Sequence, residues 1–242
     1  MTTKHEQIAA GLINNILNGR YGVGERLPSE RDLSARFDAN RGSVREAMKK
    51  LEQLGLAVIQ PGGARVKDKE EASLDVIGHL LAQSEMPDGL LIDQVLVVIN
   101  SLISVAAEQV TEFASDVEID AVCGLARPLY ERELDEEAHT LARFELMTAI
   151  MQTSKNLPLY LIARTLFQQV LPNITGLHDY LTTDRQQYAS LALQLRTALQ
   201  KRDVLAVRKT FTEFSDLHRQ TVMRAVSDAR ANLASPSQEA TS

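Results

Sequence analysis

Three short helical segments followed by a hairpin occupy the first 68 residues, and few small folds have this order of elements. Apolar residues recur at helical spacing over residues 5–17, which predicts an amphipathic helix. Ser29 is a good N-cap for a second short helix, and Asn40 is one for a third helix that ends at Gly55. The segment therefore predicts a three-helix unit with a helix-turn-helix in it.

After the third predicted helix the chain changes to an extended pattern. Residues 56–60 read LAVIQ, residues 61–63 read PGG, and residues 64–68 read ARVKD. Extended, partly β-branched segments on both sides of a glycine turn predict a β-hairpin. Residues 1–68 are thus predicted to form a winged helix-turn-helix that binds double-stranded DNA.

The third predicted helix presents Arg41, Ser43 and Arg45 away from its apolar face. In a recognition helix, arginine pairs with guanine O6 and N7, and serine reaches a base edge or a phosphate. Arg31, on the preceding helix, is expected to support the same surface. A basic helix face can also simply be solvated, but the order of helix, turn, basic helix and wing favours DNA binding.

The predicted wing has Pro61, Gly62 and Gly63 at its tip. A turn without side chains lets backbone amides approach the sugar-phosphate backbone and enter the minor groove. The alternative is an ordinary hairpin turn, and the neighbouring basic residues favour a DNA contact.

The net charge of -6 argues against nucleic-acid binding until its distribution is considered. Residues 1–68 contain 11 Lys and Arg against 8 Asp and Glu, whereas residues 69–242 contain 15 against 24. A positive segment joined to an acidic remainder is typical of a DNA-binding domain attached to a separate sensing or dimerising domain.

The composition also indicates the cellular location of the protein. No run of 18 apolar residues occurs, and the first residues show no signal-peptide or presequence pattern, so we expect a cytoplasmic protein without a membrane partner. Cys123 is the single cysteine, which excludes an intramolecular disulfide.

The remainder of the chain has helical periodicity almost throughout. We expect a linker at 69–73, an all-α effector-binding and dimerisation domain of six or seven helices at 74–231, and a disordered tail at 232–242. Asp88, Asp116 and Asp184 are plausible helix caps in this domain. The predicted fold class is therefore mostly α, with one small hairpin.

The stretch LPSERDLSARFDANRGSVREAMKKLEQLGLAVIQPGG is similar to the DNA-binding motif of the GntR family of transcriptional regulators. The resemblance implies that Arg31, Arg41, Ser43 and Arg45 contact operator DNA and that the wing at 61–63 lies in the minor groove. The family often has Ser or Thr where this chain has Gly42, so any contact from that side chain is missing here.

The helical remainder resembles the FadR subfamily of that family. The similarity is strongest in LDVIGHLLAQSEMPDGLLIDQVLVVINSLISVAAEQV and in SKNLPLYLIARTL. It implies a homodimer whose helical domain binds a small effector.

Many members of the subfamily bind a divalent metal through an Asp and three His, with a nearby Arg for the carboxylate of the effector. By position, this chain has Leu141 in place of the Asp, Ile99 in place of the Arg, and Glu145, Ala192 and Phe214 in place of the histidines. The ligand chemistry needs imidazoles and a carboxylate, so we expect neither a metal nor any other cofactor.

Apolar residues at the former ligand positions predict an apolar pocket, which favours a long-chain fatty acid or acyl-CoA over a small carboxylic acid. Candidate polar effector-binding residues are Asn100, Arg143 and Glu145, and Thr212 stands where the acyl-CoA-responsive member has a glycine close to its ligand. The alternative for these polar groups is an internal salt bridge or exposure to solvent.

The functional prediction is a repressor or activator that binds a pseudo-palindromic operator as a homodimer and responds to a metabolite. One alternative is a constitutive DNA-binding protein without an effector. Another is an enzyme built on the bundle, but the paired Glu-x-x-His motifs of a di-metal bundle are absent from the sequence, so we expect no enzyme.

Overall fold

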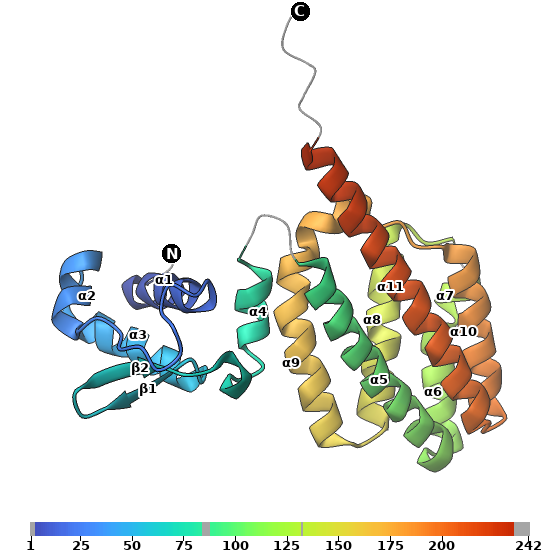
Figure 1. The fold of residues 1–242 in the computed structure, drawn as a ribbon. Coiled ribbons are helices and arrows are strands. Elements are labelled where there is room, and N and C mark those ends of the chain that lie inside the picture. The colour runs from blue at the N-terminus through green and yellow to red at the C-terminus, as the bar shows by residue number, and fades with distance from the viewer. Residues whose placement is uncertain (1–2, 84–87, 132, 235–242) are drawn as a thin grey trace, which may run out of the picture. The chain divides into compact units, whose positions relative to one another are not determined.

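The computed structural model describes residues 3–83, 88–131 and 133–234. In its N-terminal part, α1 (Lys4–Leu17), α2 (Glu30–Phe37) and α3 (Arg41–Gln53) precede the hairpin of β1 (Ala57–Gln60) and β2 (Gly63–Val66), as Figure 1 shows. A 3-10 turn, η1 (Lys69–Glu71), and a short helix, α4 (Val76–Leu81), follow. This is the predicted winged helix-turn-helix.

The helices of this unit begin where the sequence provides caps. The Ser29 hydroxyl accepts a hydrogen bond from the Asp32 amide at the start of α2, and the Asn40 side chain accepts one from the Ser43 amide at the start of α3. Asp38, in the left-handed conformation with φ 46°, ends α2 and makes the tight turn between the two helices. A core of fully buried aliphatic residues then holds the three helices together: Ile8, Leu12, Leu33, Val44, Leu51, Leu54 and Leu56.

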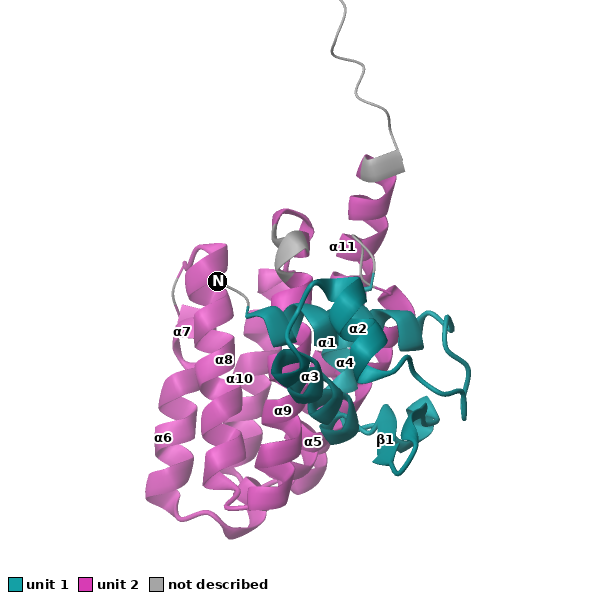
Figure 2. Cartoon of the chain, turned by 90° about the vertical axis from the view of Figure 1, so that its left-hand side faces the viewer, with its two compact units in different colours: residues 1–85 teal, residues 86–242 magenta. Residues whose placement is uncertain are grey.

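The boundary between the two compact units differs from the sequence prediction. The units comprise residues 1–85 and 86–242, shown in two colours in Figure 2. Val76 is buried in the N-terminal core, and the Ser73 amide donates to the Leu54 carbonyl at 2.9 Å. The predicted linker at 69–73 is therefore folded onto the first unit, which also includes α4.

The second unit is an all-α bundle, as predicted, with seven α-helices in its described part. They are α5 (Gly89–Phe113), α6 (Asp116–Ala126), α7 (Pro128–Glu131), α8 (Glu136–Thr153), α9 (Leu157–Ile174), α10 (Arg185–Gln200) and α11 (Val204–Ala234), with a 3-10 segment, η2 (Thr175–Tyr180), after α9. Asp88 and Asp184 cap α5 and α10 as predicted, but Ser115 rather than Asp116 caps α6, through a capping box with Glu118.

Helix α5 is the central element of this unit. It packs against α8, α9 and α11, and its inward face is formed by buried aliphatic residues that include Ile92, Ile99 and Ile103. It is also the one described helix long and apolar enough to span a membrane by length and composition alone, a test that the core helix of a soluble bundle also passes.

Helix α11 extends three residues into the predicted tail, since it ends at Ala234. The rest of that predicted tail, residues 235–242, lies outside the described residues.

Candidate DNA-binding surface and effector cavity

Helix α3 carries the predicted reading residues on its outer face. Val44, Ala47 and Met48 turn inward to the core, whereas Arg41 and Arg45 are exposed and Ser43 is partly exposed. Within the described ranges Arg41 makes no hydrogen bond or ion pair. Its guanidinium is therefore free to meet a base edge or a phosphate.

Arg45 is held by a carboxylate from the preceding helix. Its Nε donates to both carboxylate oxygens of Glu30, each at 3.0 Å, and the two side chains are 63% and 41% exposed. An exposed pair of this kind contributes only about 0.2–1 kcal/mol. Arg45 would therefore have to leave Glu30 before it contacts DNA, and the cost of leaving is small. In the absence of DNA the pair holds the Arg45 side chain in one orientation.

Arg31 lies on α2 with its side chain 83% exposed, and its nearest carboxylate oxygen, in Asp32, is 3.8 Å from Nε. It is available for a phosphate contact beside the recognition helix.

The wing tip depends on its glycines. Gly62 and Gly63 have φ of 100° and 126°, a region that other residues rarely adopt. A Cβ on Gly63 would also lie 2.8 Å from Nε of Arg26, whereas a Cβ on Gly62 would meet nothing within 4 Å. Pro61 and Gly62 are exposed, so the backbone of the tip is accessible to a DNA groove.

Arg26 is a cationic residue of the wing that the sequence analysis did not single out. It is exposed, and it pairs with Arg65 in an isolated antiparallel bridge next to the hairpin. The Arg65 guanidinium donates to the Gly24 carbonyl at 2.8 Å. The register that brings residue 26 beside residue 65 is a long-range feature without a local sequence signal.

The second unit contains a cavity of about 660 Å³, which we call the effector cavity. Its size lies in the range of small-molecule pockets. Most of its lining is apolar, contributed by α5, α8, α9, α11 and the segment after η2: Leu96, Ile99, Leu141, Phe144, Met147, Phe167, Val170, Leu171, Ile174, Leu181 and Val222. An apolar molecule with few polar groups fits such a lining.

Arg143 is the one cation among the residues that line this cavity. Its guanidinium donates to the hydroxyls of Thr140 (2.8 Å) and Thr183 (3.4 Å) and lies 5.5 Å from the ring centre of Tyr188. Burial lowers the pKa of Arg143, yet within the described ranges no carboxylate lies within ion-pair distance of it. Arg143 is partly buried. Removing a cation from water without an ion-pair partner is costly, and an anionic ligand would reduce that cost.

The Glu136 carboxylate offsets part of this charge from beyond ion-pair distance. The Thr183 hydroxyl accepts from Arg143 and donates to Glu136 (2.9 Å), and the negative charge of Glu136 raises the pKa of Arg143 against the effect of burial. Burial raises the pKa of Glu136, but the hydrogen bonds from Thr183 and Arg185 and the charges of Arg185 and Arg143 lower it overall. Glu137 is exposed. Neither carboxylate forms an ion pair with Arg143 in the described part of the chain.

Asn100 adds a second unsatisfied donor to the same cavity. The side chain is 8% exposed and lines the cavity, and its Nδ2 has no hydrogen-bond partner among the residues that the structure describes. A buried amide donor without a partner costs about 1–3 kcal/mol. An acceptor-bearing ligand would recover that cost.

Two histidines near Arg143 are neutral at physiological pH. Burial, with a smaller effect from Arg143, lowers the pKa of His139 to about 4 and that of His218 to about 3. His218 lines the cavity, and both rings pack against Tyr188. They therefore add no positive charge, and Arg143 alone would attract an anion.

The remaining predicted positions fall elsewhere. Glu145 and Thr212 are exposed and do not line the effector cavity, and the Thr212 hydroxyl donates to the Arg208 carbonyl of its own helix. Of the former metal-ligand positions, Leu141 lines the cavity, whereas Ala192 and Phe214 are buried. Among the described residues no group of three or more His, Cys, Asp or Glu could hold a metal ion.

Comparison with known protein families identifies the first unit. Residues 4–66 match the family described as bacterial regulatory proteins, gntR family. The match covers α1 to β2, the elements that carry the residues predicted to contact DNA.

Curated relatives extend the similarity into the second unit. The chain is 36% identical over 86 residues to the uncharacterized HTH-type transcriptional regulator Rv0494 of Mycobacterium tuberculosis, covering 35% of this chain and 36% of that protein. It is 32% identical over 139 residues to the HTH-type transcriptional repressor NanR of Citrobacter rodentium, covering 55% and 51%. With NanR of Escherichia coli K12 the identity is 27% over 203 residues, covering 79% and 75%.

A solved structure shares the fold. The structure of Lar, which controls the expression of the Listeria monocytogenes agr system, covers 93% of this chain and 97% of its own chain with a TM-score of 0.55 and 17% identity. At that identity the likeness concerns the architecture alone.

Proposed function

Since this chain belongs to the gntR family of bacterial regulatory proteins, with the helical second unit of the FadR subfamily, we propose that it binds a pseudo-palindromic operator as a homodimer and responds to an anionic, largely apolar effector. It is a transcriptional regulator and not an enzyme, like its relatives. We expect it to act in the cytoplasm. The observation that carries the effector proposal is Arg143, a partly buried cation in a mostly apolar cavity that forms no ion pair within the described residues.

The effector proposed is a long-chain fatty acid or its acyl-CoA, and fatty acid metabolism is the process proposed to be regulated. The lining of the cavity supports an acyl chain, and Arg143 with Asn100 supports a carboxylate or thioester head. A small carboxylic acid would leave most of the apolar lining unfilled. For DNA, Arg31, Arg41, Ser43, Arg45 and the wing at 61–63 are the proposed contacts.

Effector binding is expected to stabilise the protein against heat. A ligand at a hundredfold excess over its Kd stabilises the folded state by about 2.7 kcal/mol, which corresponds to roughly 5–10 °C in melting temperature for a chain of this length. Differential scanning fluorimetry with fatty acids and acyl-CoAs measures this shift, and a saturable rise is the expected result. The absence of any shift would favour a regulator without such an effector.

The same titration is expected to be insensitive to EDTA, because the metal-ligand positions hold Leu141, Glu145, Ala192 and Phe214. A response that EDTA removes and zinc restores would contradict the proposal that no metal takes part.

A second copy of this chain is the proposed partner along α5. Leu90, Val97, Val98 and Val105 are exposed on one face of this helix, where Gln94 and Ser101 are exposed between them. We call the four apolar residues the stripe, and exposed apolar side chains that recur on one face favour an interface. Two reading units carried by one dimer would contact half-sites about one helical turn apart on the DNA.

The double variant Val98→Glu with Val105→Glu is expected to be a monomer. Burying two carboxylates in an apolar interface costs more than the interface recovers. Analytical ultracentrifugation measures the mass, and footprinting on fragments selected from genomic DNA shows whether two half-sites stay protected. Val117→Glu is the matched control, since Val117 is 79% exposed on α6, outside the stripe. A dimer that persists in the double variant would place the interface elsewhere.

A further inference from the structure

A second, smaller cavity adjoins the effector cavity. It has a volume of about 160 Å³ and lies between α8 and α9, and we call it the distal cavity. Met151, Tyr160 and Ala163 line it away from the effector cavity, while four residues line both: Phe144, Met147, Phe167 and Leu171. The two spaces are therefore neighbours with a common wall.

The lining residues show that the two cavities follow one another along the same groove. On α8 the effector cavity is lined from residue 136 to 147 and the distal cavity from 144 to 151. On α9 the order is reversed, with 167 to 174 for the effector cavity and 160 to 171 for the distal one. Helices α8 and α9 are antiparallel and joined by a short loop. Residue numbers that rise along α8 and fall along α9 therefore run the same way in space, and the distal cavity follows the effector cavity in that direction.

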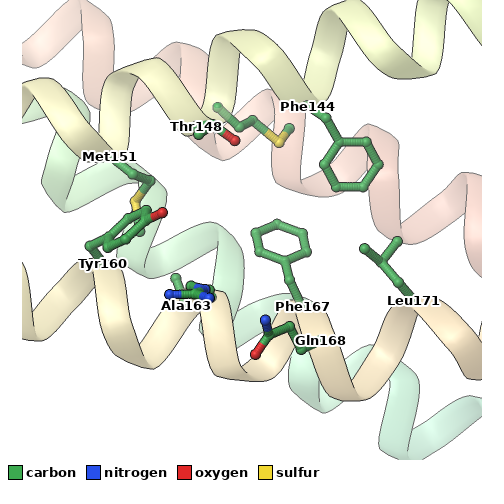
Figure 3. A pocket seen from close by; sticks show the side chains of 10 residues that line it. Phe144, Thr148, Met151, Tyr160, Ala163, Phe167, Gln168 and Leu171 are labelled. Atoms are coloured by element: carbon green, nitrogen blue, oxygen red, sulfur yellow. The ribbon is translucent and has the colours of Figure 1, made fainter.

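An aromatic pair stands at the junction. The rings of Phe144 and Phe167 are 5.7 Å apart between centres and 67° between planes, an edge-to-face contact. In Figure 3 the two rings point toward one another from facing helices. Both side chains are only partly buried, so a rotamer change would move either ring without disrupting the core.

Arg143 lies on the effector-cavity side of the aromatic pair. Its guanidinium reaches back along α8 to Thr140, whereas Met151 lies eight residues beyond Arg143, about 12 Å along the helix axis. Beyond the pair, the distal cavity is lined by Met151, Tyr160 and Ala163 and also by three exposed polar residues, Thr148, Arg164 and Gln168. The aromatic pair thus separates Arg143 from the distal cavity.

We infer that Phe144 and Phe167 form a gate that sets effector chain length, and that the distal cavity takes the end of an acyl chain whose carboxylate lies at Arg143. The inference rests on the proposed effector. With the gate closed, a chain fills the effector cavity and stops at the rings. A longer chain must displace them and enter the distal cavity.

The gate predicts a break in the dependence of affinity on chain length. Each methylene that leaves water strengthens binding, on the order of tenfold in Kd for every two methylenes. In the wild-type protein this gain is expected to stop, or to become much smaller, at the length where the chain meets the rings. In Phe144→Ala or Phe167→Ala the gain is expected to continue over several further methylenes.

The experiment measures Kd by isothermal titration calorimetry for saturated fatty acids of increasing length, below their micelle concentrations. Phe144→Leu serves as a milder variant if the alanine variant is unstable. Phe144→Ala with Thr148→Phe fills the distal cavity from an exposed lining position and is expected to restore the wild-type break. Phe113→Ala is the matched control, because Phe113 is 75% exposed and lines neither cavity.

The outcomes separate the gate from the proposed effector. The gate is supported if the chain length at which affinity stops rising is longer in the alanine variants and returns to the wild-type length in the double variant. An unchanged break with binding intact overturns the gate and leaves the proposed effector standing. Failure of the wild-type protein to bind any member of the series overturns both.

Discussion

Arg41→Ala is expected to weaken operator binding by roughly ten- to a hundredfold while the protein stays dimeric. A bidentate contact between arginine and guanine contributes about 1–3 kcal/mol of discrimination, and Arg41 has no other partner among the described residues that would be left unsatisfied. Fluorescence anisotropy with an operator fragment measures the loss, and ultracentrifugation measures the dimer.

Arg45→Ala is expected to cost less than Arg41→Ala, because Arg45 must leave the Glu30 carboxylate before it meets DNA. Arg127→Ala is the matched control, since Arg127 is an exposed arginine of the second unit in an ion pair with Glu131. Operator affinity that is unchanged in both Arg41→Ala and Arg45→Ala would contradict the recognition-helix assignment.

The winged helix-turn-helix was predictable because its determinants are local. Ser29 and Asn40 cap the helices that they precede, and Gly62 and Gly63 adopt the positive φ that a tight wing turn needs. The partners of the reading residues were not predictable in the same way. Glu30 and Arg45 are fifteen residues apart on different helices, and their pairing depends on how the helices cross.

The division into compact units differs from the predicted domain boundary because the residues of α4, VIGHLL, have the same apolar periodicity as the bundle that follows. Sequence pattern shows that a helix has an apolar face but not which core receives it. Val76 packs into the first core, so the division follows α4 instead of preceding it.

The cavity residues show the same limit. Asn100 and Arg143 line the effector cavity, but Glu145, two positions from Arg143, is rotated by about 200° around α8 and faces solvent. Apolar residues occur on several sides of α8, including the exposed Leu141, so periodicity alone did not indicate which face is inward. The gate has no sequence signature, because Phe144 and Phe167 meet only when α8 and α9 pack.

Arg143→Met is expected to weaken effector binding without destabilising the free protein. Charge-assisted hydrogen bonds contribute about 1.5–3 kcal/mol, so the Kd for a fatty acid is expected to rise by one to two orders of magnitude. In the free protein, Arg143 is partly buried and forms no ion pair within the described residues. Replacing such a charge by an apolar side chain of similar volume, here methionine, is often neutral or stabilising. The melting temperature without effector is therefore expected to stay the same or rise, while the shift on adding a fatty acid at the same concentration becomes much smaller.

A higher Kd together with an unchanged or higher melting temperature of the free protein would distinguish a ligand-binding arginine from a structural one. If Arg143 mainly held Thr140, Thr183 and the Tyr188 ring in place, Arg143→Met would lower the melting temperature and leave the affinity nearly unchanged. Arg143→Lys keeps the charge but loses the planar fork that meets a carboxylate bidentately. It is expected to restore part of the affinity, so the order of Kd values should be wild type, then lysine, then methionine. A lysine variant no better than methionine would show that the charge of Arg143 is not what holds the effector.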